Sequence, residues 1–226
     1  MGEHDGHRER LRKQFLDHGM ESMRDYEVLE LLLFYAIPRR DTNALARQLL
    51  KHFGSIAAIL EASPAELKNV AGIGENAAVL LRLITPLSRR YLQSRTDKGI
   101  ILNSTRACGK FLIPYFLGEV DELAYLLCLD AKHKLLTCRL LHRGSVNAVA
   151  VSLRKAAEIA MACNATSVVL AHNHPGGLAL PSDEDYATTN QLREAMKLLG
   201  IRLEDHIIVA DDDYVSMADN GYFLDP

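Results

Sequence analysis

The stretch that decides the fold of the second half of the chain is AHNHPGGLALPSDED, residues 171–185. The run SVVLAH, which ends inside this stretch, predicts a short buried strand over residues 167–172. Residues i and i+2 of a strand point to the same side. His172 and His174 can therefore present both imidazoles to one point, with Asn173 turned away from them.

The end of the same stretch predicts a helix that can return a carboxylate to that point. Ser182 is suited to cap the helix, and Asp185 stands at the third helical position, as in a capping box. Helix capping alone explains these two residues, but it does not require a matched pair of histidines at the end of an apolar strand. Two histidines and one carboxylate make three ligands, with a fourth position left for water, which is typical of a catalytic zinc site.

Outward from this stretch, the second half alternates strand and helix patterns. Two apolar runs flank the short turn AKH and predict an antiparallel pair of strands. We expect an α+β domain of strands with two packed helices. The predicted strands are residues 122–130, 134–144, 167–172, 202–210 and 214–217, and the predicted helices are residues 152–164 and 181–200.

The first half of the chain reads as helical throughout. Capping serines, a proline at a first helical position and a terminal glycine delimit helices over residues 25–36, 41–54, 55–62 and 63–70. The apolar content drops near QSRTDKGIILNST. We therefore place a domain boundary near residues 95–103, between a helical domain (1–95) and the α+β domain (103–226).

Composition indicates an ordinary soluble protein. The 226 residues are 48% hydrophobic and 24% charged, with a formal net charge of −3. The four cysteines form no CxxC pair and mostly lie in apolar runs, which favours buried thiols in a reducing, cytoplasmic compartment. The start of the chain lacks the apolar core of a secretory signal, and the longest apolar run is too short for a membrane span.

A second motif lies in the helical half. VAGIGENAA places Gly72 and Gly74 between two helices, so that free amides at the second helix start can receive a phosphate oxygen. Glu75 at the helix start opposes this, whereas Lys68 and nearby arginines favour it. The residues leave contact with the DNA backbone and ordinary helix packing equally open.

These motifs resemble known families. His172, His174, Ser182 and Asp185 match the H-x-H-x7-S-x2-D motif of the JAMM (MPN+) metalloproteases. More narrowly, AHNHPGG, RLEDHIIV and YVSM are similar to the RadC (UPF0758) family, in which a helix-hairpin-helix region, here residues 67–82, precedes such a domain. The resemblance implies a JAMM/MPN-type, cytidine-deaminase-like mixed sheet with flanking helices.

The resemblance also implies roles for single residues. His172, His174 and Asp185 would bind Zn²⁺, and Ser182 would hydrogen-bond the oxyanion or the water on the metal. An upstream glutamate would be the general base; Glu122 is our choice, with Glu119 as a substitute. His206 matches a family position as a core or supporting histidine, or alternatively as a ligand. Two residues depart from the family pattern: Gly176 replaces a serine and Lys155 a glutamate.

Two functions follow as hypotheses. The first is a zinc-dependent hydrolase that cleaves a peptide or isopeptide bond in a protein or peptide substrate. The alternative is a DNA-associated recombination or repair protein that binds the DNA backbone through Lys68, Gly72 and Gly74, with the metal site auxiliary or inactive. We expect no membrane partner.

Overall fold

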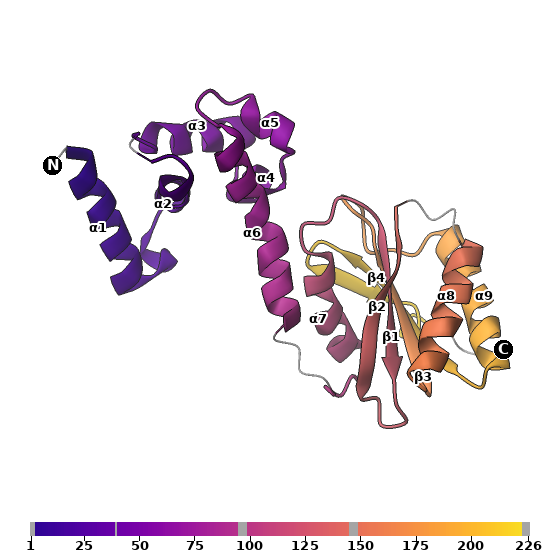
Figure 1. Cartoon of the computed structure of the whole chain (residues 1–226). Helices are drawn as coiled ribbons and strands as arrows, with labels where there is room; N and C mark the ends of the chain where they lie inside the picture. The colour runs from indigo at the N-terminus through magenta and orange to yellow at the C-terminus, as the bar shows by residue number, and fades with distance from the viewer. Residues whose placement is uncertain (1–2, 39, 95–98, 145–148, 223–226) are drawn as a thin grey trace. The chain divides into compact units, whose positions relative to one another are not determined.

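The structure is a computed structural model that describes residues 3–38, 40–94, 99–144 and 149–222 (Figure 1). The chain divides into two compact units, residues 1–88 and 89–226. The boundary predicted near residues 95–103 lies partly outside the described residues, since 95–98 are among those left out.

The first unit is helical and has its own core. Its helices follow the predicted capping signals: Ser55 and Ser63 accept hydrogen bonds from the amides of Ala58 and Glu66, and Gly54 ends a helix. Its core is a cluster of apolar residues that runs in sequence from Leu29 to Leu81. The elements are α1 (Glu3–His18), the 3-10 helix η1 (Met20–Ser22), α2 (Asp25–Ala36), α3 (Asn43–Phe53), α4 (Ile56–Glu61), α5 (Pro64–Lys68) and α6 (Glu75–Ser94), whose last residues belong to the second unit.

The second unit is a five-stranded mixed sheet with helices on both faces, which makes the chain α+β (Figure 1). The strand order is β2-β1-β3-β4-β5, and among the strands of the described residues only the pair β3 and β4 runs parallel. The predicted hairpin and the three later strands are confirmed. The strands are β1 (Leu123–Leu129), β2 (Leu135–Arg143), β3 (Ser167–Asn173), β4 (Arg202–Ala210) and β5 (Asp213–Ser216).

The prediction of two packed helices in this unit was wrong, because a third helix, α7 (Thr105–Phe116), precedes the sheet. It covers one face, with Phe111, Leu112 and Phe116 in the core. The expected helices α8 (Val149–Ala162) and α9 (Asp183–Leu198) cover the other face (Figure 1). Alternate residues of β3 serve the two cores: Val169 and Ala171 face α7, while Val168 and Leu170 face α8 and α9.

All four cysteines are free thiols, two of them buried. Burial raises the pKa of Cys108 and of Cys138 to about 12, so both stay protonated at neutral pH. Among the described residues, no helix combines the length and the apolar character needed to cross a membrane.

Candidate metal centre

The sheet topology gathers the candidate residues at one edge. His172 lies near the end of β3, and it continues the face of Leu170 toward α8 and α9. Because β1 runs antiparallel to β3, with Ala124 opposite His172, the start of β1 lies beside the end of β3. Glu122, directly before β1, is thereby brought to the same edge as the histidines.

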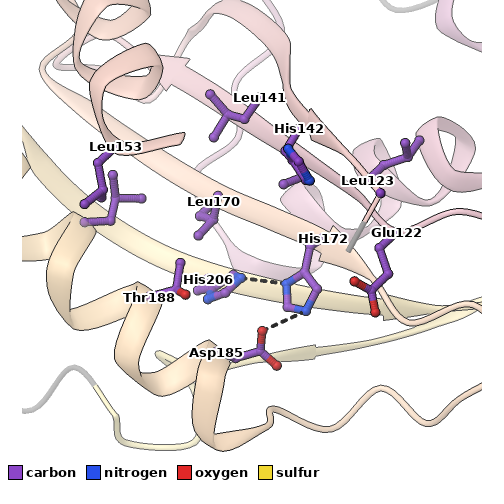
Figure 2. A pocket seen from close by; sticks show the side chains of 13 residues that line it. Glu122, Leu123, Leu141, His142, Leu153, Leu170, His172, Asp185, Thr188 and His206 are labelled. Atoms are coloured by element: carbon purple, nitrogen blue, oxygen red, sulfur yellow. Dashed lines mark hydrogen bonds and ion pairs between the residues drawn. The ribbon is translucent and has the colours of Figure 1, made fainter. Parts of the chain in front are cut away.

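Three side chains converge there. Nε2 of His172 lies 2.9 Å from Nε2 of His174 and 3.0 Å from Oδ1 of Asp185, while Nε2 of His174 lies 3.4 Å from Oδ2 of Asp185. Two atoms bound at 2.0–2.1 Å to a tetrahedral zinc ion are about 3.3 Å apart. The spacing of the three groups therefore fits the edges of such a site; Figure 2 shows His172 and Asp185 of this group.

Hydrogen bonds assign the ring protons of His206 and of His172. Thr189 donates its single hydroxyl proton to the Asp185 carbonyl oxygen at 2.5 Å. In its 2.6 Å contact with Thr189, Nδ1 of His206 must therefore be the donor. Burial lowers the pKa of His206 well below its ordinary value, so this ring is neutral and its Nε2 is an acceptor. Nδ1 of His172, 2.8 Å from it, donates, and Nε2 of His172 carries a lone pair.

His174 is oriented in the same way by its own loop. Its Nδ1 lies 3.1 Å from the carbonyl oxygen of Leu178, which can only accept. Nε2 of His174 therefore also carries a lone pair when the ring is neutral. Two lone pairs and a carboxylate thus face one another, an arrangement that repels itself unless a cation or an added proton lies between them.

Asp185 is a charged partner for such a cation. Burial alone would raise the pKa of this carboxyl, but an added proton on Nε2 of His172, which supplies a hydrogen bond and a positive charge, and the hydrogen bonds from Ser182 lower it well below the ordinary value. The side chain is nevertheless only 6% exposed. A buried carboxylate that stays charged beside two imidazoles has the chemistry of a metal ligand.

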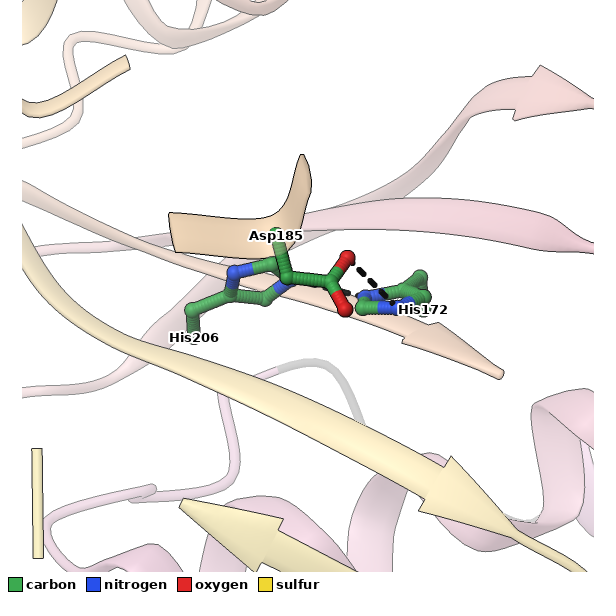
Figure 3. A group of neighbouring side chains, drawn as sticks. All are labelled: His172, Asp185 and His206. Atoms are coloured by element: carbon green, nitrogen blue, oxygen red, sulfur yellow. Dashed lines mark hydrogen bonds and ion pairs between the residues drawn. The ribbon is translucent and has the colours of Figure 1, made fainter. Parts of the chain in front are cut away.

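His206 lies within the candidate metal centre itself, so the structure bears on whether it is a ligand or a supporting histidine. His172, Asp185 and His206 form a group of buried side chains whose ligand atoms lie within 4.8 Å of one another (Figure 3). Both ring nitrogens of His206, however, already have partners in His172 and Thr189. We therefore place His206 behind His172, where it fixes the orientation of that ring.

Ser182 has the capping role expected of it. Its hydroxyl accepts from the Asp185 amide at 3.2 Å and donates to Oδ2 of Asp185 at 2.8 Å, while its own amide also donates to Oδ2 at 2.8 Å. The hydroxyl can reach a substrate oxygen only by leaving Asp185. In this structure it orients the carboxylate, and a role toward the oxyanion stays a prediction.

The structure separates the two candidates for the general base. The carboxylate of Glu119 is 8% exposed and paired with the guanidinium groups of Arg89 and Arg143. Glu122 lines the same pocket as His172 and Asp185, and its carboxylate points toward that group (Figure 2). Geometry thus favours Glu122.

Sequence reasoning missed two supporting residues. Asn173 accepts from the Leu123 amide at 2.7 Å and donates to the Asp121 carbonyl at 3.1 Å, so it clamps the segment that carries Glu122. Thr189 stands one helical turn after Asp185 and fixes the tautomer of His206. A threonine four residues after a predicted ligand was a visible signal; the Asn173 contacts needed the pairing of β1 with β3.

Comparison with known proteins agrees with this architecture. Residues 102–222 match the family model described as a RadC-like JAB domain, and residues 4–79 match the UPF0758 N-terminal model. A UPF0758 protein of Rhodobacter capsulatus is 37% identical over 211 residues, which is 93% of this chain and 99% of that protein. Another, from Azotobacter vinelandii, is 36% identical over 214 residues, covering 95% of this chain and 96% of that protein.

The chain belongs to the UPF0758 family. Its RadC-like JAB domain departs from the expected pattern at Gly176 and Lys155, and the structure shows a structural role for each residue. Gly176 has a φ of 66°, a left-handed conformation that glycine adopts without strain. Lys155 donates from Nζ to the Leu141 carbonyl oxygen at 2.9 Å, so it ties α8 to β2.

The glycine turn of the UPF0758 N-terminal region lies between α5 and α6. Gly72 has a φ of 100°, and a Cβ there would meet Leu45 at 3.4 Å, so this glycine serves a tight, left-handed turn. Lys68 pairs with Glu75 at 2.8 Å, which places a neutralised pair at the start of α6. Binding of the DNA backbone by Lys68, Gly72 and Gly74 stays a prediction, to be checked through the salt dependence of DNA binding.

Proposed function

We propose that the RadC-like JAB domain is a zinc-dependent hydrolase that cleaves a peptide or isopeptide bond. The observation that carries the proposal is the convergence of two imidazole lone pairs and a buried carboxylate at one point, beside Glu122. His172, His174 and Asp185 would hold the ion. A bound zinc ion polarises a carbonyl oxygen and lowers the pKa of water to about 7.

The chain's own residues supply the proton transfers. The Glu122 carboxylate accepts the proton of the attacking water and returns it to the nitrogen of the departing amine, the two steps of general base and general acid catalysis. His206 and Thr189 keep Nδ1 of His172 protonated, so Nε2 stays available to the ion. Ser182 and the start of α9 hold Asp185 in place.

The metal assignment is tested by the zinc content of the purified full-length chain. We expect about one zinc ion per chain in the wild type and loss of zinc in His172→Ala/His174→Ala, because two of three ligands disappear. The double variant His52→Ala/His133→Ala removes histidines outside the site and should retain zinc. Full zinc occupancy in His172→Ala/His174→Ala would refute the assignment.

The catalytic assignment is tested separately. Glu122→Gln should keep its zinc but cleave a mixture of plain and isopeptide-linked peptides at least about 100-fold more slowly, as expected for loss of a general base. Glu158→Gln, which alters an exposed glutamate on α8 paired with Arg154, is the matched control. An unchanged rate in Glu122→Gln would show that another group takes the proton.

A further inference from the structure

A pocket extends from the candidate metal centre between the sheet and the helices α8 and α9 (Figure 2). Glu122, His172, Asp185 and His206 line its polar end. The remaining wall is mostly aliphatic, and His142 and Thr188 are its polar members. Its aliphatic side chains come from β1, β2, β3, α8 and α9: Leu123, Ala124, Leu141, Leu153, Leu170 and Leu192.

The two ends of this pocket call for different chemistry in one occupant. The polar end offers a carboxylate and imidazoles, which suit a polar, hydrogen-bonding group such as an amide. The aliphatic end offers water few partners, so filling it with an apolar group is favourable. An amide with an apolar side chain next to it, as in a peptide, matches both ends in the required order.

We infer that the pocket receives the large apolar side chain of a residue that flanks the cleaved amide bond. This inference rests on the proposed function and narrows its substrate class. The preferred substrate is a peptide with leucine, phenylalanine or a similar residue beside the scissile bond, rather than glycine. A glycine has no side chain to fill the space beside Leu153, Leu170 and Leu192.

Thr188 is the position from which the pocket can be filled on purpose. It stands on α9 between Asp185 and Leu192, lines the pocket and is half-buried. Thr188→Phe puts a ring where the substrate side chain is inferred to lie. Its neighbour Ala187 is exposed and does not line the pocket, so Ala187→Phe is the matched control on the same helix.

The test measures binding, so that it does not depend on turnover. The full-length chain is titrated with N-acetyl-L-leucinamide or N-acetylglycinamide while the leucine methyl signals are followed by NMR. We expect leucinamide to shift the signals of Leu153 and Leu170 and to bind about tenfold more tightly than glycinamide. Thr188→Phe should abolish the difference, and Ala187→Phe should preserve it.

Equal binding of the two amides, or a preference that Thr188→Phe leaves intact, would overturn the inference. If Thr188→Phe does not fold, Leu153→Phe fills the same pocket from α8 and should abolish the preference for leucinamide; a preference that survives it counts against the pocket. Absence of peptide cleavage by the wild type would refute the proposed function instead, because the preference for leucinamide is measured without cleavage.

Discussion

Asn173 connects the two chain segments that carry the candidate ligands and the candidate base. It lies between the two histidines in sequence, yet its amide is bonded to the backbone of Asp121 and Leu123 on the neighbouring segment. The residue is 4% exposed, so neither bond can be replaced by bulk water without rearrangement. One side chain thereby fixes the distance between Glu122 and the imidazoles.

We therefore expect Asn173→Ala to lower the free energy of unfolding of the second unit by about 1–3 kcal/mol, since it leaves the buried Leu123 amide and the part-buried Asp121 carbonyl without this partner. Hydrolysis should fall further than stability explains, because Glu122 loses its position. Urea unfolding and the cleavage rate measure the two effects. Asn173→Asp keeps the acceptor for Leu123 and should be intermediate in stability; no change in Asn173→Ala would contradict the clamp.

At the scale of the element, the first turn of α9 serves both folding and the site. The same three contacts between Ser182 and Asp185 cap the helix and orient a candidate ligand. Another helix of this unit, α7, is also capped by a serine: Ser104 accepts from the Ala107 amide at 3.2 Å. Unlike Ser182, Ser104 caps its helix without a bond to a candidate ligand. The two caps allow the two roles to be separated.

Ser182→Ala and Ser104→Ala should each lower the free energy of unfolding by about 0.5–2 kcal/mol, the usual cost of an N-cap. Only Ser182→Ala should also weaken zinc binding, by about 10- to 100-fold, because it frees a group that holds a ligand. Thermal unfolding and competition with a chelator provide the two readouts. Equal zinc affinity in the two variants would mean that Ser182 serves the helix alone.

The helices also show which elements could be predicted from sequence. α9 has a capping serine, acids in its first turn and an apolar stripe, and each signal agrees with the others. α7 has a capping serine too, but Gly109 and Pro114 lie inside it and argue against a helix. The structure explains the glycine, because a Cβ at Gly109 would come within 2.5 Å of the Tyr214 ring. That contact joins residues far apart in sequence and is invisible before folding.

The site divides in the same way. His172, His174 and Asp185 follow from strand alternation and a helix start within fifteen residues of sequence. Choosing Glu122 over Glu119 required the antiparallel pairing of β1 and β3 and the arginines that occupy Glu119. The link from His172 through His206 to Thr189 joins β3, β4 and α9. Local pattern predicts the candidate ligands, whereas tertiary pairing decides their partners.

At the scale of the whole molecule, each unit has a hydrophobic core of its own. In the first unit, one cluster runs in sequence from Leu29 to Leu81. In the second unit, one cluster runs from Leu102 to Val209 and another from Leu126 to Leu203. The candidate ligands lie on β3 and α9 or the loop between them, all in the second unit. Zinc binding should therefore act on the stability of the second unit alone.

A ligand that binds only the folded state stabilises it by RT ln(1 + [L]/Kd), about 2.7 kcal/mol at a concentration 100-fold above Kd. Amide hydrogen exchange through global opening of the second unit should then slow about 100-fold in β1, β3 and β4, while α2 to α5 keep their rates. The double variant His172→Ala/His174→Ala should show no zinc effect in either unit. Equal slowing in α2 to α5 of the wild type would mean that the two units open together, so that occupation of the metal centre controls the stability of the entire chain.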